Sequence, residues 1–164
     1  MGSKFKCFLI RSLTLLDTPK FAFIFALVTY FLLSTLGGNP FRVRNTAYFN
    51  YLADAFLHGQ FYLRLLPRTT HDLSLFQGHL YLYWPPMPAV ILMPLVAVFG
   101  VAVSDVFFNV VVAALNVAVV AALLRSVDRA GLIRITGEYR ALLVLFFALG
   151  TVQVILALFG RVWY

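Results

Sequence analysis

Charged residues are scarce in this chain of 164 residues: Asp, Glu, Lys and Arg make up 12%, whereas 62% of the residues are hydrophobic. Together with a mean hydropathy of +0.91, this composition excludes an ordinary soluble domain. Cysteine is nearly absent, since Cys7 is the single one, which excludes an internal disulfide framework and a multi-cysteine metal cluster. The sequence also lacks a Gly-rich phosphate loop and a Gly-x-Ser-x-Gly motif.

Acidic residues are fewer than basic ones, with 6 Asp and Glu against 13 Lys and Arg and a net charge of +7. The basic residues flank apolar runs and do not form a solvated patch, so they do not indicate a nucleic-acid partner. No charge lies inside the longest apolar runs, which leaves an ion or proton pathway without a candidate residue. The composition therefore predicts a membrane protein whose partners include lipids and exclude nucleic acid.

Three apolar runs, 21–38, 106–124 and 141–160, predict membrane-spanning helices. A helix that rises about 1.5 Å per residue needs roughly 20 residues to cross a hydrocarbon core of about 30 Å. The first run follows a helix-start signal and lacks a small-x-small cleavage site before its Gly-Gly-Asn-Pro stop. We therefore expect it to be an anchor and not a cleaved signal.

A fourth apolar run, 88–103, is short and is interrupted by Pro94 and Gly100. If this run crossed the membrane, the loop 125–140 with its four arginines would lie outside, against the positive-inside rule. If the run stays at the outer interface, that loop and the basic segment 1–20 both lie inside. The charges therefore favour three spans.

The resulting fold class is an all-α integral membrane protein of the plasma (inner) membrane with a cytoplasmic N-terminus. Its segments are, in order, an inner basic N-terminus (1–20), a first span (21–38), an outer loop with juxtamembrane helices (39–105), a second span (106–124), an inner basic loop (125–140), a third span (141–160) and an outer end (161–164). Three spans bury little against one another, and lipid provides no hydrophobic drive for their association. We expect an incomplete bundle, completed by further helices of the same enzyme or by partner subunits.

The outer loop contains an amphipathic helix over 46–58, because apolar residues recur there at helical spacing. Asn50, Asp54 and His58 stand four residues apart, which predicts a solvated polar face on this helix. Asp54 is alternatively a functional carboxylate.

Asp72 is a second candidate carboxylate, set between His71 and a polar turn at Gly78. A carboxylate on a water-facing loop can act as a general base or a metal ligand, or can simply cap a turn. His58, His71 and His79 are separated by 13 and 8 residues, a spacing that does not favour zinc.

Aromatic and basic residues of the outer loop are candidate substrate contacts. Tyr81, Tyr83 and Trp84 can stack on a sugar ring or lie at the depth of the lipid headgroups. Arg42 and Arg44 can bind a phosphate or extend to any headgroup.

The outer loop resembles the first outer loop of GT-C fold glycosyltransferases, such as aminoarabinose transferases of lipid A and protein O-mannosyltransferases. The resemblance is carried by the order and spacing of Tyr48, Gly59, Gly78, Tyr81 and Pro85-Pro86. It covers roughly residues 21–161 and matches the N-terminal part of such an enzyme. It implies a polyprenyl-phosphate sugar as donor and transfer of the sugar to an acceptor on the outer face, with a divalent cation left open as a cofactor.

The chain departs from that family where an acidic pair normally follows the first span, since Arg44 and Asn45 stand there. Either Asp72, which we favour, or Asp54 then supplies the catalytic carboxylate, or the chain uses another chemistry or is inactive. The implied substrate contacts are Arg42, Arg44, His71, Tyr81, Tyr83, Trp84 and Arg161. We expect no transferase activity from these 164 residues alone.

The alternative is a non-catalytic multi-pass membrane subunit or scaffold, which the missing acidic pair favours. Asn109 and Asn116 lie seven residues apart with Ala113 between them, as in a seam that packs helices together.

Single cysteines test the predicted topology. In a Cys7→Ser background, Ser104→Cys should react with a membrane-impermeant thiol reagent on intact cells, whereas Gly131→Cys should not. The opposite pattern would establish four spans and an outer arginine loop.

Overall fold

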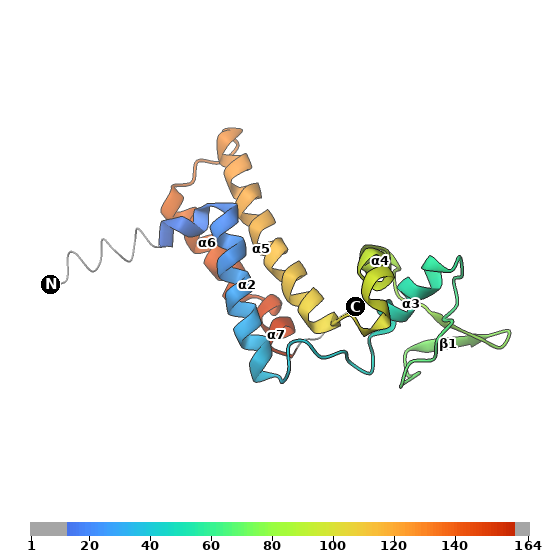
Figure 1. The fold of residues 1–164 in the computed structure, drawn as a ribbon. Coiled ribbons are helices and arrows are strands. Elements are labelled where there is room, and N and C mark those ends of the chain that lie inside the picture. Colours follow the sequence, from blue (N-terminus) through green and yellow to red (C-terminus); the bar gives the residue numbers. More distant parts are fainter. Residues whose placement is uncertain (1–12, 160–164) are drawn as a thin grey trace. The chain divides into compact units, whose positions relative to one another are not determined.

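The computed structural model describes residues 13–159, with side chains up to residue 155, and this part of the chain is largely helical (Figure 1). The chain forms two compact units. Among the described residues, the first unit comprises 13–40 and 107–159, and the second unit comprises Phe41–Val106. Most of the basic N-terminal segment and the outer end 161–164 lie outside the described residues.

Within residues 13–159, two helices are long and apolar enough to cross a membrane: α2 (Pro19–Leu36) and α5 (Asp105–Arg129). A short 3-10 turn, η1 (Leu15–Asp17), precedes α2, and Pro19 occupies the first turn of the helix, where its missing N–H needs no partner. Helix α5 continues five residues beyond the expected end at Leu124, so the predicted inner loop is partly helical.

The third expected span differs from the prediction, because residues 141–160 do not form one helix. Helix α6 (Gly137–Gly150) ends before Thr151, and α7 (Val152–Phe159) begins after it. Thr151 adopts an extended conformation, and its hydroxyl donates to the carbonyl of Phe147 at 2.7 Å. A Gly-Thr pair favours such a break, since glycine has low helix propensity and a threonine hydroxyl competes for backbone groups.

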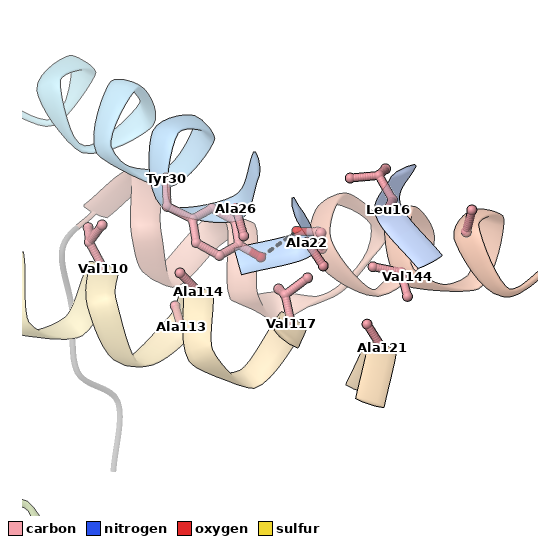
Figure 2. Packing of buried hydrophobic residues seen from close by; sticks show 12 residues of the cluster. Leu16, Ala22, Ala26, Tyr30, Val110, Ala113, Ala114, Val117, Ala121 and Val144 are labelled. Carbon is pink, nitrogen blue, oxygen red and sulfur yellow. Dashed lines mark hydrogen bonds between the residues drawn. The ribbon is translucent and has the colours of Figure 1, made fainter. Parts of the chain in front are cut away.

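Small residues form the core of the first unit (Figure 2). Buried alanines come from all three of the longer helices, and they let the backbones approach closely. They are Ala22, Ala26, Ala113, Ala114, Ala121, Ala141 and Ala148. The large exception is Tyr30, which is fully buried and whose hydroxyl donates to the carbonyl of Ala148 at 2.8 Å. This bond joins α2 to the last turn of α6.

An arginine organises the end of the first unit where α5 is followed by α6. The guanidinium of Arg140 binds both oxygens of Asp17, at 2.7 and 2.9 Å, and one oxygen of Asp128, at 2.6 Å. The hydrogen bond from Arg140 lowers the pKa of the Asp17 carboxyl below its ordinary value. Asp128 also accepts the backbone N–H of Ile135 at 3.1 Å, which joins the connecting loop to α5. One cation thus connects three segments of the chain.

Arg140→Gln should lower the free energy of unfolding by about 2 kcal/mol at neutral pH, because charge-assisted hydrogen bonds are lost. The folded-state pKa of Asp17 lies below its unfolded value of about 3.9, so this stability is present above that value and disappears as the pH falls through the lowered pKa. Thermal unfolding in detergent should therefore show the difference between the two proteins shrinking as the pH falls below about 4. Arg134→Gln, at an exposed position, is the control, and a pH-independent difference would contradict the role of Asp17.

The second unit contains α3 (Tyr48–Leu57), a hairpin of β1 (Leu73–Phe76) and β2 (His79–Leu82), α4 (Met87–Phe99) and a 3-10 turn η2 (Gly100–Ala102). The helices confirm the ones expected over 46–58 and 88–103, although the second of these ends in η2. The hairpin corrects the purely helical fold class. Its two turn residues, Gln77 and Gly78, both have positive φ, as a type I′ turn requires.

The predicted solvated face of α3 is wrong in its most important members. Asn50 and Asp54 are buried, whereas His58 and Leu57 are exposed. The Asn50 amide donates to the carbonyls of Val101 and Val103, at 3.0 and 2.7 Å. Asn50 and Asp54 therefore face polar groups of the second unit and do not form a solvated surface.

Candidate functional site

Asp54 lies on α3 and is held by an arginine that follows the helix. Arg64 donates to both Asp54 oxygens at 3.1 Å, a bidentate contact. The imidazole Nδ1 of His58 lies 2.7 Å from the Asp54 carbonyl and 3.7 Å from its carboxylate. The Asp54 residue is only 8% exposed. A carboxylate held in this way is suited to fixing the loop after α3 and poorly placed to accept a proton from a substrate.

Asp105, the first residue of α5, is an acidic residue that sequence reasoning did not select. Its oxygens accept the backbone N–H of Arg44 at 3.0 Å and the guanidinium Nε of the same residue at 2.5 Å. Both side chains are largely buried. Arg44, predicted as a phosphate contact, therefore already has an anionic partner. An acidic residue at a helix start was visible in the sequence, but its pairing with a residue 61 positions away was not.

Asp72 differs from these two carboxylates. It is half-buried at the start of the hairpin, in a turn that Leu73 closes by donating its N–H to the Thr70 carbonyl at 3.2 Å. Within the described part of the chain, no arginine, lysine or histidine lies within ion-pair distance of Asp72. His71 beside it is exposed. The geometry leaves the Asp72 carboxylate accessible to a ligand.

The predicted aromatic contacts lie on β2 and just after it. Tyr83 is exposed and packs against Trp84, with ring centroids 5.0 Å apart. Tyr81 is half-buried and contacts Tyr62 and Phe76 by ring edges. Of the predicted site residues, the structure brings Tyr83 and Trp84 into direct contact with each other.

The remaining predicted basic contacts are Arg42 and Arg161. Arg42 is half-buried, and its backbone carbonyl accepts the hydroxyl of Ser104 at 2.9 Å, which ties the start of the second unit to its end. Arg161 lies outside the described residues.

An apolar pocket of about 420 Å³ lies between the end of α3 and the first turns of α4. Phe56, Phe61, Val90 and Met93 are among the residues that line it. Gln60 also lines this pocket, and its side-chain oxygen is buried without a hydrogen-bond partner in the described structure. The pocket has the chemistry of a site for a hydrocarbon group.

A metal site is not formed by the residues that the structure describes: no three His, Cys, Asp or Glu side chains among them are grouped so that they could hold an ion.

Comparisons with known proteins leave the site to be interpreted from its own geometry. No family model, no curated protein and no solved structure matches the chain.

Asp105→Ala should destabilise the second unit by about 3 kcal/mol, because it leaves the largely buried Arg44 guanidinium without its anion. Asp72→Ala should change the free energy of unfolding by less than about 0.5 kcal/mol, because Asp72 has no such partner. Thermal unfolding of the purified chain in detergent, followed by circular dichroism, measures both. Equal midpoints for the two variants would contradict the assignment of Asp105 as a structural carboxylate.

Proposed function

We propose that this chain is the N-terminal part of a membrane glycosyltransferase that moves a sugar from a polyprenyl-phosphate donor to an acceptor on the outer face of the membrane. In this proposal the chain is a multi-pass protein of the plasma (inner) membrane with its N-terminus in the cytoplasm. Helices α2 and α5 are two spans, and α6 with α7 forms the third. The second unit then lies on the outer side, and further helices of the same enzyme or of partner subunits complete the bundle.

The observation that carries the proposal is the difference among the three carboxylates of the second unit. Asp54 and Asp105 are buried and bound by arginines, whereas Asp72 is half-buried and accessible. A general base must reach the proton that it removes, so Asp72 is the residue suited to this task. The order of elements also supports the proposal, since the amphipathic helix, Gly78 and the Pro-Pro pair precede α4 in the order that the resemblance implies, although the hairpin around Gly78 was not expected.

The chemistry needs few groups. The carboxylate of Asp72 accepts the proton of an acceptor hydroxyl as the oxygen attacks the anomeric carbon of the sugar. The bond from that carbon to the phosphate oxygen breaks, and polyprenyl phosphate leaves with the electron pair. A phosphate is already a good leaving group, so a base and cations that stabilise its charge are sufficient, and no covalent enzyme intermediate is required.

The donor would be held by its phosphate and by its hydrocarbon chain. Arg42 lies at the start of the second unit and Arg161 is a further candidate for the phosphate, whereas Arg44 is already paired with Asp105. The apolar pocket between α3 and α4 offers space for part of the prenyl chain, with Val90 and Met93 in its wall.

The second candidate is a non-catalytic membrane subunit, and one observation agrees with it as well as with the enzyme. Asn116 is exposed near the middle of α5, whereas Ala113 on the same helix is buried. An amide on the lipid-facing surface of a span indicates a partner helix that accepts its hydrogen bonds. A partner helix is equally required by an enzyme with more spans, so this observation supports a larger assembly in both cases.

Asp72→Asn should lower the rate of donor turnover by roughly 10²- to 10⁴-fold, because the amide cannot accept the proton. The measurement is release of polyprenyl phosphate from a labelled polyprenyl-phosphate sugar, in membranes of cells that express the protein from its own gene. Glu138→Gln is the matched control, since it removes an exposed carboxylate of the first unit.

Full turnover in Asp72→Asn would refute the role of this carboxylate. Absence of turnover in the wild type would instead favour the non-catalytic subunit, and a photoreactive residue at position 116 would cross-link the partner helix that both candidates require.

A further inference from the structure

One face of the hairpin carries aromatic rings, and the other carries leucines. In the register of the two strands, Ser74 lies opposite Tyr81 and Phe76 lies opposite His79. Directly opposed residues of an antiparallel pair share a face, so these four lie on one side of the hairpin. Leu73, Leu75, Leu80 and Leu82 pair with one another on the other side.

The aromatic rings on the first side are in contact with one another. Tyr62 stacks on His79 with centroids 4.0 Å apart and an interplanar angle of 27°. The ring of Tyr81 makes edge contacts with Tyr62 at 6.2 Å and with Phe76 at 6.3 Å. We refer to Tyr62, Phe76, His79 and Tyr81 as the aromatic face. Phe76 is 61% exposed and His79 is also exposed, so the rings nearest the turn remain accessible.

We infer that the aromatic face binds an oligosaccharide, and that the acceptor of the transfer is therefore a glycan. The statement about the acceptor rests on the proposed function, whereas the binding site does not. One side of a pyranose or furanose ring presents C–H groups that pack on an aromatic ring, and its hydroxyls need hydrogen-bond partners. The aromatic face offers rings for the C–H groups and hydrogen-bond partners for the hydroxyls. These partners are the two phenol hydroxyls, the imidazole and the hydroxyl of Ser74 on the same side of the hairpin.

The distance along the strand determines the length of the glycan. Phe76 lies three residue steps beyond Leu73, or roughly 10 Å at the rise of a β-strand, and Asp72 lies one residue further still. A ligand that packs on Phe76 and presents a hydroxyl to Asp72 must span this distance. One sugar unit is too short to do so, and therefore the ligand has several units.

Charge determines a second property of the glycan. From Thr70 to Trp84 the sequence contains no lysine or arginine, and Asp72 is acidic. A phosphorylated or carboxylated glycan would meet no counter-charge in this segment and would be repelled by Asp72. Arg64, two residues from Tyr62, is already bound to both oxygens of Asp54. The aromatic face therefore fits a neutral oligosaccharide.

The test uses the full chain in lipid nanodiscs and a panel of neutral linear oligosaccharides of three to six hexose or pentose units, with the monosaccharides for comparison. Saturation-transfer NMR should detect binding of at least one oligosaccharide and no monosaccharide. Phe76→Ser and the milder Phe76→Leu should weaken that binding about tenfold or more, because the ring is lost. Leu75→Ser is the matched control, since Leu75 is 73% exposed on the opposite face of the same strand, and it should leave binding unchanged.

Failure of every oligosaccharide to bind the wild type would overturn the inference, as would an equal loss of binding in Leu75→Ser. Asp72→Asn separates this result from the proposed function, because Asp72 is not part of the aromatic face and its amide variant should still bind the glycan. If Asp72→Asn has full donor turnover while Phe76→Leu loses the glycan, the catalytic proposal fails and the glycan site stands. If turnover depends on Asp72 but no oligosaccharide binds, the glycan site fails alone.

Discussion

A buried carboxylate in a chain this apolar must be paired with a cation, and much of the structure follows from this requirement. The sequence has 6 acidic residues, and all of them lie in the described part of the chain. Arginines bind four of these: Asp17, Asp54, Asp105 and Asp128. Two pairs join a helix to a loop, Asp54 with Arg64 and Asp105 with Arg44, and Arg140 joins α6 to η1 and to α5. Asp72 and Glu138 remain, and of these only Asp72 lies in the second unit.

The acidic residues therefore fall into two groups with different roles. In the proposed enzyme, carboxylates that are held by arginines keep the fold in place, and a carboxylate without such a partner is left to accept a proton. The same division applies to the arginines. Arg44 and Arg140 neutralise acids of the chain itself, which reduces the number of cations that remain for a donor phosphate.

Local sequence features predict the helices well, and long-range pairing escapes them. Apolar runs predicted α2 and α5 because length and hydropathy are properties of contiguous residues. The alternating leucines around Gln77-Gly78 were compatible with a hairpin, but the predicted fold class did not include one. The partner of Asp105 lies 61 residues away, and no spacing rule connects such positions. The buried stripe of Asn50 and Asp54 misled the prediction of the site, because periodicity identifies the residues on a helix face and does not show which face meets water.

The break at Thr151 ends α6, and the last carbonyls of a helix have no partner within the helix itself. Here two side-chain hydroxyls replace the missing N–H groups: Thr151 serves the carbonyl of Phe147, and Tyr30 of α2 serves that of Ala148. These two bonds serve two of the last four carbonyls of α6, and one of the two donors belongs to α2. The end of α6 therefore depends on the first helix for part of its hydrogen bonding.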